Sequence, residues 1–154
     1  MNAPYEQNHK SIVILMAEDN EDDFILTKRA FEKNKILNPL ICVKDGQELL
    51  DYLQRKGSYT DENKYPTPGL ILLDLNMPRM DGRVALNLIK KDEKLRKIPI
   101  IVMTTSNSEE DIVRSYDLGV NSYIRKPIEV KDFVTMIGKF KSYWLDIVEV
   151  PKPA

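Results

Sequence analysis

Residues 71–82 read ILLDLNMPRMDG, and the class of the fold can be argued from these twelve residues. Aliphatic residues run without interruption into Asp74, and Pro78 and Gly82 follow shortly after it. A continuous apolar run of this kind is typical of a strand covered on both faces of a sheet, where a carboxylate costs free energy. We therefore place Asp74 at the end of a buried strand, and the neighbouring segments must explain why an acid stands there.

Outward from this stretch, short apolar runs alternate with amphipathic segments of helical length. The expected strands cover residues 11–17, 40–43, 70–73, 98–103 and 122–125, and the expected helices cover residues 20–34, 45–56, 82–91, 108–119 and 130–149. This alternation predicts an α/β fold with a doubly wound, five-stranded parallel sheet and helices on both faces. We expect the flavodoxin-like strand order 2-1-3-4-5, with the shorter, more polar fifth strand at an edge.

Polar residues mark the start of the first four predicted helices. The expected N-caps are Asn20, Asp45, Asp81 and Ser108. Asp22 and Asp23 are interpreted as acids of a first helical turn, and Gly119 as a left-handed helix stop. An apolar stripe extends the last helix to residue 149; its members are Phe133, Ile137, Phe140, Trp144 and Val148.

The rest of the chain divides around one domain. Residues 1–10, which include His9, are expected to form a flexible N-terminal arm without a catalytic role; residues 11–149 form the domain, and residues 150–154 a C-terminal tail. Residues 57–69 are polar and rich in turn formers, so we expect an enlarged loop without structure of its own.

Composition excludes several classes of protein. The 154 residues carry a formal net charge of -1, which argues against a general nucleic-acid binder. The single cysteine, Cys42, cannot form an internal disulfide. No apolar run approaches the roughly 20 residues that cross a membrane, and the first strand runs into acids rather than a signal-peptide cleavage site. We therefore expect a soluble, cytoplasmic protein without a membrane segment.

Four of the five predicted strands end in residues with complementary chemistry. The first strand is followed by Glu18 and Asp19, the third by Asp74, the fourth by Thr104 and the fifth by Lys126. Parallel strands bring these residues to one edge of the sheet, and ligands of doubly wound sheets bind at that edge where the strand order reverses. In the expected order this crevice lies between the first and third strands, which supply the three acids.

Three neighbouring carboxylates repel one another by roughly 1 to 4 kcal/mol for a pair about 4 Å apart. Oxygen ligands of this kind suit Mg²⁺, which with Lys126 would neutralise the site. A neutral site can accept an anionic phosphoryl group, and Asp74 can act as the nucleophile because carboxylates form aspartyl phosphates. Taken singly, each residue is better explained by a turn or a helix cap; their convergence on one edge favours the functional interpretation.

The sequence resembles the receiver domains of two-component response regulators. The resemblance lies in AEDN (17–20), ILLDLNMPRMDG (71–82), IPIIVMTTS (98–106) and YIRKP (123–127), in that order, over residues 11–141. A narrower resemblance, in the enlarged loop and the Trp-Leu pair near the end, is to single-domain regulators that partner cyanobacterial phytochromes. The resemblance implies a two-component signalling protein that is not an enzyme apart from its own phosphorylation and dephosphorylation.

The resemblance also assigns roles to individual residues. It makes Asp74 the phosphoacceptor, and it makes Glu18, Asp19, Asp74 and the backbone carbonyl of Asn76 the Mg²⁺ site. Thr104 and Lys126 would contact the phosphoryl group, and Tyr123 would be the aromatic residue that turns inward when Thr104 moves. The family further implies a cis bond between Lys126 and Pro127, a form that occurs in only about 5 to 6% of X–Pro bonds.

Partners follow from the same resemblance. The phosphodonor would be a sensor histidine kinase, with a phytochrome-type kinase as one candidate. Phosphorylation would switch the face made by the fourth helix, fifth strand and fifth helix toward protein–protein output. The chain leaves no room for a DNA-binding output domain, so the expected partners are a downstream protein, a phosphotransfer protein or a second copy of the chain. Tyr143, Trp144 and Leu145 either extend a dimer face or pack on their own domain.

Some features depart from the family or favour a rival. Thr105 stands where receivers usually carry a small residue, beside the access path of the phosphate. A haloacid-dehalogenase-type phosphatase would need a second acid where this chain has Asn76, and a nucleotide or flavin carrier would need a glycine-rich loop after the first strand. The alternative that stays open is a receiver-like binding module that is never phosphorylated.

Overall fold

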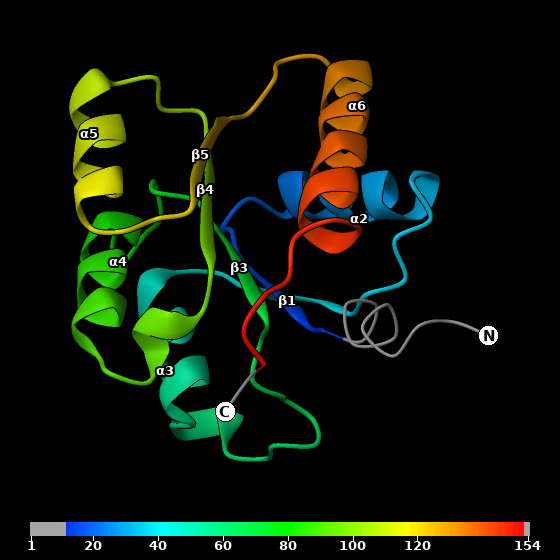
Figure 1. The fold of residues 1–154 in the computed structure, drawn as a ribbon. Coiled ribbons are helices and arrows are strands. Elements are labelled where there is room, and N and C mark those ends of the chain that lie inside the picture. The colour runs from blue at the N-terminus through cyan, green and yellow to red at the C-terminus, as the bar shows by residue number, and fades with distance from the viewer. Residues whose placement is uncertain (1–11, 153–154) are drawn as a thin grey trace.

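The computed structural model describes residues 12–152 and shows a five-stranded parallel sheet between two layers of helices (Figure 1). The strand order is β2-β1-β3-β4-β5, as predicted. The strands are β1 (Ile14–Ala17), β2 (Leu40–Val43), β3 (Leu70–Leu73), β4 (Ile100–Thr104) and β5 (Ser122–Arg125). The helices are α2 (Glu21–Lys33), α3 (Gly46–Gln54), α4 (Gly82–Lys91), α5 (Glu109–Asp117) and α6 (Val130–Phe140). The arm expected at residues 1–10 lies outside the described residues.

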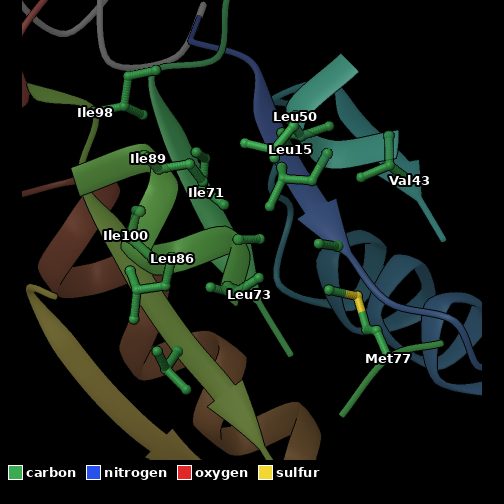
Figure 2. Close-up of a cluster of buried hydrophobic side chains, with 14 of the residues drawn as sticks. Leu15, Val43, Leu50, Ile71, Leu73, Met77, Leu86, Ile89, Ile98 and Ile100 are labelled. Atoms are coloured by element: carbon green, nitrogen blue, oxygen red, sulfur yellow. The ribbon is translucent and has the colours of Figure 1, made fainter. Parts of the chain in front are cut away.

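Apolar side chains cover both faces of the sheet. Helices α3, α4 and α5 lie on one side, and α2 and α6 lie on the other (Figure 1). Successive strand residues point to opposite faces, so in β3 Ile71 and Leu73 join the cluster under α3 and α4 (Figure 2), whereas Leu70 and Leu72 join the cluster under α2 and α6. Burial on both sides explains why the central strands lack a polar alternation.

The register of the strands brings their carboxyl ends level. Ala17 pairs with Val43 on one side and with Leu73 on the other, and Leu73 pairs with Val102. Thr104 pairs with Arg125. Glu18 follows β1, Asp74 follows β3 and Lys126 follows β5, so these three residues of the predicted site lie at the same edge of the sheet.

The predicted caps begin the first four helices. The Asn20 side chain accepts a hydrogen bond from the Asp23 amide at 3.0 Å, and Asp45 accepts from the Glu48 amide at 2.8 Å. Asp81 and Ser108 do the same for α4 and α5. Gly119 follows α5 with a φ of 96°, a left-handed conformation that glycine adopts without strain. The cap predictions are confirmed.

The prediction that residues 57–69 lack structure of their own is wrong. A short 3₁₀ helix, η1 (Gly57–Tyr59), begins the segment, and the rings of Tyr52, Tyr59 and Tyr65 pack with centroids 4.9 to 5.8 Å apart. The Tyr52 hydroxyl donates to the Pro66 carbonyl at 2.7 Å, and the guanidinium of Arg55 donates to the Tyr65 carbonyl at 3.0 Å. Aromatic packing and side-chain bonds to the backbone hold this loop on α3.

The last helix is shorter than its apolar stripe predicts. Helix α6 ends at Phe140, and the chain continues as a π-helical segment, η3 (Lys141–Leu145). There the Asp146 and Val148 amides donate to carbonyls five residues earlier, at 3.0 and 2.8 Å. The wider turn keeps Trp144 and Val148 on the same apolar cluster without an α-helix, so spacing alone gave the wrong end.

Two further observations concern exclusions made from the sequence. Among the helices of residues 12–152, none combines the length and the apolar character that a bilayer span requires. Cys42 is a free, half-buried thiol in β2, and burial raises its pKa to about 11. A thiol with so high a pKa stays protonated at neutral pH and is a poor nucleophile.

Candidate functional site

The predicted acids meet at the carboxyl ends of β1 and β3. Glu18, Asp19 and Asp74 each offer a carboxylate oxygen, and these oxygens lie within 4.8 Å of one another. Glu18 and Asp74 are buried, whereas Asp19 is exposed. The grouping follows from the pairing of β1 with β3, because the Asp74 amide donates to the Ala17 carbonyl at 3.1 Å and extends the ladder beyond the last paired residues.

Asp74 is held from both sides. Its Oδ1 accepts the Thr104 hydroxyl at 2.8 Å, and its Oδ2 accepts the Lys126 ammonium at 3.2 Å. The close turn that follows depends on Gly82, whose amide donates to the Leu75 carbonyl at 2.9 Å; a Cβ at Gly82 would lie 2.2 Å from the Asp74 carbonyl oxygen. The motif that ends in Gly82 therefore serves to bring α4 against the strand that carries Asp74.

Lys126 is the cation of the site. It is buried, its amide donates to the Thr104 carbonyl at 2.7 Å, and its ammonium donates to Glu18 and Asp74. Burial alone would lower the pKa of Lys126, but the hydrogen bond to Glu18 and the charge of Asp74 raise it above its ordinary value. The ammonium therefore stays protonated at any physiological pH and supplies a fixed positive charge beside Asp74.

Burial also changes Glu18. It raises the pKa of Glu18 to about 7, although the hydrogen bond and the charge of Lys126 act in the opposite direction. The charge of Asp74 adds to the increase. One lysine does not balance the acids around it, so the site favours a proton or a further cation.

Asp23 belongs to the site, and sequence reasoning missed it. Its Oδ2 accepts the Lys126 ammonium at 3.1 Å from the first turn of α2. An acid in a first helical turn already has a local explanation, which hid this second role. The signal was available, because α2 begins three residues after Glu18 and its first turn must therefore lie over the carboxyl edge of the sheet.

The loop after Asp74 carries Asn76, whose side chain is exposed. Two contacts with the start of α3 tie down the far end of this loop. Arg79 has a left-handed φ of 59°, and its guanidinium donates to the buried Asp45 carboxylate at 2.7 Å. The Gly46 amide donates to the Met80 carbonyl at 2.9 Å. The ion pair offsets the strain of a non-glycine residue in this conformation and keeps the loop close to the acids.

The end of β4 supplies the other wall. Thr104 is fully buried, and the Ser106 amide lies 3.4 Å from its hydroxyl oxygen. Tyr123 is half-buried, and its hydroxyl donates to the Ser106 carbonyl at 2.9 Å. Thr105 is exposed. The structure thus brings Thr104 onto Asp74 and connects Tyr123 to the same loop.

A cis Lys126–Pro127 bond, implied by the family resemblance, is wrong for this chain. No cis peptide bond occurs in residues 12–152. The trans form is the intrinsically preferred one by about 0.5 to 1 kcal/mol for X–Pro bonds, and Lys126 reaches Glu18 and Asp74 from it.

The donor set fits a divalent cation. Three carboxylates within 4.8 Å of one another, two of them buried, form the all-oxygen environment that Mg²⁺ prefers. Glu18, Asp19 and Asp74 would hold such an ion. Its positive charge would help to neutralise oxygens of a phosphoryl group bound at the same place.

Comparison with known proteins shows the family of this chain. The model of the response regulator receiver domain matches residues 14–138. The chain belongs to the response regulator receiver family. Response regulator Rcp1 of Synechocystis sp. is 40% identical over 146 residues, which are 95% of this chain and 97% of that protein.

Solved structures of receiver domains share the fold closely. The crystal structure of the phosphorylated cyanobacterial phytochrome response regulator RcpA has a TM-score of 0.86 at 37% identity and covers 92% of this chain and 99% of its own. The Mn²⁺-bound form of Rcp1 has a TM-score of 0.84 at 40% identity, with the same coverage. This chain is thus a receiver domain of two-component signalling, a family that binds a divalent metal in the acidic pocket and is phosphorylated on an aspartate.

Proposed function

We propose that Asp74 is the phosphoacceptor of this receiver domain and that a sensor histidine kinase supplies the phosphoryl group. The observation that carries the proposal is the setting of Asp74, which is buried between the Thr104 hydroxyl and the Lys126 ammonium and has Glu18 and Asp19 beside it. Asp81, the other acid of the same motif, caps α4 and bonds to Arg83 instead. Position therefore singles out Asp74.

The chemistry needs little more than positioning. A carboxylate oxygen of Asp74 forms a bond to phosphorus while the bond from phosphorus to the imidazole nitrogen of the kinase breaks, and the electron pair stays on that nitrogen. Lys126 neutralises negative charge on the transferred group, and the Thr104 hydroxyl is placed to donate to it. Glu18, Asp19 and Asp74, with the Asn76 carbonyl, would hold the Mg²⁺.

A phytochrome-type kinase is the phosphodonor that the relatives suggest. RcpA is a cyanobacterial phytochrome response regulator, and it matches 92% of this chain at 37% identity. Similarity over almost the full length, and not only at the site, supports the assignment of the same class of kinase here. The proposed donor is therefore a histidine kinase with a light-sensing input.

The test is incubation with acetyl phosphate and Mg²⁺ followed by measurement of the intact mass. We expect one added phosphoryl group, which Asp74→Asn and chelation of the metal both abolish. Asp117→Asn is the matched control, since it neutralises an exposed acid at the end of α5 and should leave the mass gain unchanged. An unchanged mass at every Mg²⁺ concentration would favour the alternative, a receiver-like binding module that is not phosphorylated.

We also propose that output uses the face made by α5, β5 and α6. Val113 and Tyr116 of α5 are about half exposed, and the Tyr116 hydroxyl accepts the Tyr123 amide at 3.2 Å. A movement of the Tyr123 backbone would therefore displace the Tyr116 side chain on this face. Of the candidates for a dimer contact near the C-terminus, Trp144 and Leu145 are buried in their own domain and only Tyr143 is exposed.

Size-exclusion chromatography with and without beryllofluoride, which mimics the phosphoryl group, tests a dimer through this face. We expect a larger species with beryllofluoride and Mg²⁺, and we expect Val113→Asp to prevent it. Equal elution volumes in both conditions would exclude phosphorylation-linked dimerisation and leave a different protein as the output partner.

A further inference from the structure

A chain of hydrogen bonds leads from the phosphoacceptor into the loop between β4 and α5. Thr104, the last residue of β4, donates its hydroxyl to Asp74 at 2.8 Å. Two residues on, the Ser106 hydroxyl donates to Asp111 Oδ2 at 2.7 Å, while the Ser106 carbonyl accepts the Tyr123 hydroxyl at 2.9 Å. Ser106 is thus the residue at which the contacts of Thr104, Tyr123 and Asp111 meet.

Asp111 is itself held by an arginine from another helix. Arg83 of α4 donates from Nε to Asp111 Oδ1 at 2.7 Å and from Nη2 to Oδ2 at 2.6 Å. This is a two-bond, charge-assisted pairing, the geometry that fixes both partners most firmly. Helix α4 follows the loop after Asp74 and α5 follows the loop after Thr104, so the pair joins the two helices that follow these loops.

The ordinary explanation for Asp111 is a first-turn acid that completes a capping box. In a capping box its carboxylate would accept the amide of the N-cap residue, Ser108. That amide instead donates to Ser106 Oγ at 3.3 Å. The hydrogen bonds of the Asp111 carboxylate are to Arg83 and Ser106, with Oδ2 shared between them. Asp111 therefore serves the loop more than its own helix.

We propose that Asp111, held by Arg83, is a positioning residue that fixes Ser106 and thereby keeps Thr104 and Tyr123 in the arrangement that receives the phosphoryl group. The inference rests on the proposed function of Asp74. Among the described residues, neither Asp111 nor Arg83 is hydrogen-bonded to Glu18, Asp19 or Asp74, although Arg83 also donates to the Leu75 carbonyl and to Asn76 Oδ1, both at 3.5 Å. The influence of Asp111 passes through the loop, so its loss should slow phosphorylation without weakening the binding of Mg²⁺.

The test compares Asp111→Asn, Ser106→Ala and the double variant with the unmodified protein. With acetyl phosphate at a fixed Mg²⁺ concentration, each single variant should be phosphorylated about five- to tenfold more slowly. The double variant should be no slower than the slower single variant, because both changes break one connection. The dissociation constant for Mg²⁺, measured by calorimetry, should stay within twofold.

Arg114→Met is the matched control for Arg83→Met. Arg114 of α5 lines a groove between α4 and α5 together with Arg83, but it makes no ion pair in the part of the chain that the structure describes. We expect Arg83→Met to slow phosphorylation like Asp111→Asn and Arg114→Met to leave it within twofold. Equal rates for Asp111→Asn and the unmodified protein, or additive losses in the double variant, would overturn the proposal.

A second measurement does not depend on phosphorylation. Amide hydrogen exchange of the peptide covering residues 104–111 should become about tenfold faster in Asp111→Asn and in Ser106→Ala, and should not change in Arg114→Met. Failure of the unmodified protein to accept phosphate would disprove only the proposed role of Asp74. Amide hydrogen exchange would still decide whether Asp111 fixes the loop. Unchanged exchange in both variants would reject the positioning role.

Discussion

The carboxyl edge of the sheet, where the parallel strands end, and the amino edge, where they begin, treat their polar groups differently. At the carboxyl edge, Glu18 and Asp74 are buried beside a single lysine, and burial raises the pKa of Glu18 to about 7. At the amino edge, the loop after α3 is stabilised by tyrosine rings and by hydrogen bonds to backbone carbonyls. The carboxyl edge keeps an excess of negative charge, whereas the polar groups of the amino edge are hydrogen-bonded within the loop and to α3.

This difference separates stability from ligand binding. The amino edge satisfies its polar groups internally, as with the Tyr52 hydroxyl on the Pro66 carbonyl, so it needs no ligand. The carboxyl edge leaves like charges close together, which a cation or a proton must compensate. Changes at the amino edge should therefore alter folding alone, and changes at the carboxyl edge should alter the response to ligands.

The largest effect should come from removing a tyrosine at the amino edge. Tyr52 is 2% exposed and packs on Tyr59 and Tyr65. Tyr52→Ala should lower the free energy of unfolding by about 3 to 5 kcal/mol, because it removes a large buried ring and leaves a cavity. Urea denaturation measures the loss, and calorimetry should show Mg²⁺ binding unchanged within twofold.

Tyr52→Phe is the companion variant for that experiment. It keeps the ring and removes only the hydroxyl that donates to Pro66, so the expected loss is about 1 kcal/mol. A Mg²⁺ affinity that falls in either variant while the protein is still folded would break the proposed independence of the two edges.

An intermediate effect is expected from Mg²⁺ itself. Ligand that binds only the folded chain stabilises it by RT ln(1 + [L]/Kd), about 1.4 kcal/mol at ten times the dissociation constant. Urea denaturation with and without Mg²⁺, at matched ionic strength, should show this gain in the unmodified protein and in Tyr52→Phe. The gain should be lost in Asp19→Asn. Stabilisation of Asp19→Asn by the same amount would place the ion elsewhere.

Much of the fold could be predicted from local pattern. The bounds of β3, β5 and α4 agree with the prediction, because apolar runs, a helix cap and glycine turns mark them in the sequence. The end of α6 could not be predicted, since a π-helical turn and an α-helix place Trp144 on the same apolar cluster. The order of the loop after α3 was hidden for another reason: Tyr52 and Pro66 are 14 residues apart, and turn propensity is blind to such contacts.

The candidate site was predictable where strands deliver residues and hidden where helices do. Parallel topology alone brings Asp74 and Lys126 to one edge. Asp23 and Asp111 also reach that edge, but each stands in a first helical turn, where an acid is already expected. Their partners, Lys126 and Arg83, are 103 and 28 residues away in the sequence. Only the three-dimensional arrangement shows that these acids do more than favour a helix.

The smallest effect should be the acid sensitivity of the Asp111–Arg83 pair, which tests whether the carboxyl edge alone responds to protons. The hydrogen bond from Arg83 lowers the pKa of Asp111 to about 2 from an ordinary value of 3.8. A lowered folded-state pKa means that this stabilisation is complete above pH 4 and is lost as the pH falls through 2. Because solvent partly screens the pair, we expect its contribution to the free energy of unfolding to be about 1 kcal/mol.

The measurement is the difference in unfolding free energy between the unmodified protein and Asp111→Asn, which should shrink between pH 5 and pH 2. The corresponding difference for Tyr52→Phe should stay constant. Burial raises the pKa of Tyr52 to about 12, so its hydroxyl does not titrate in this range. A constant difference for Asp111→Asn would mean that the carboxylate does not depend on Arg83 for its charge, and the contrast between the two edges would then rest on the metal-binding acids alone.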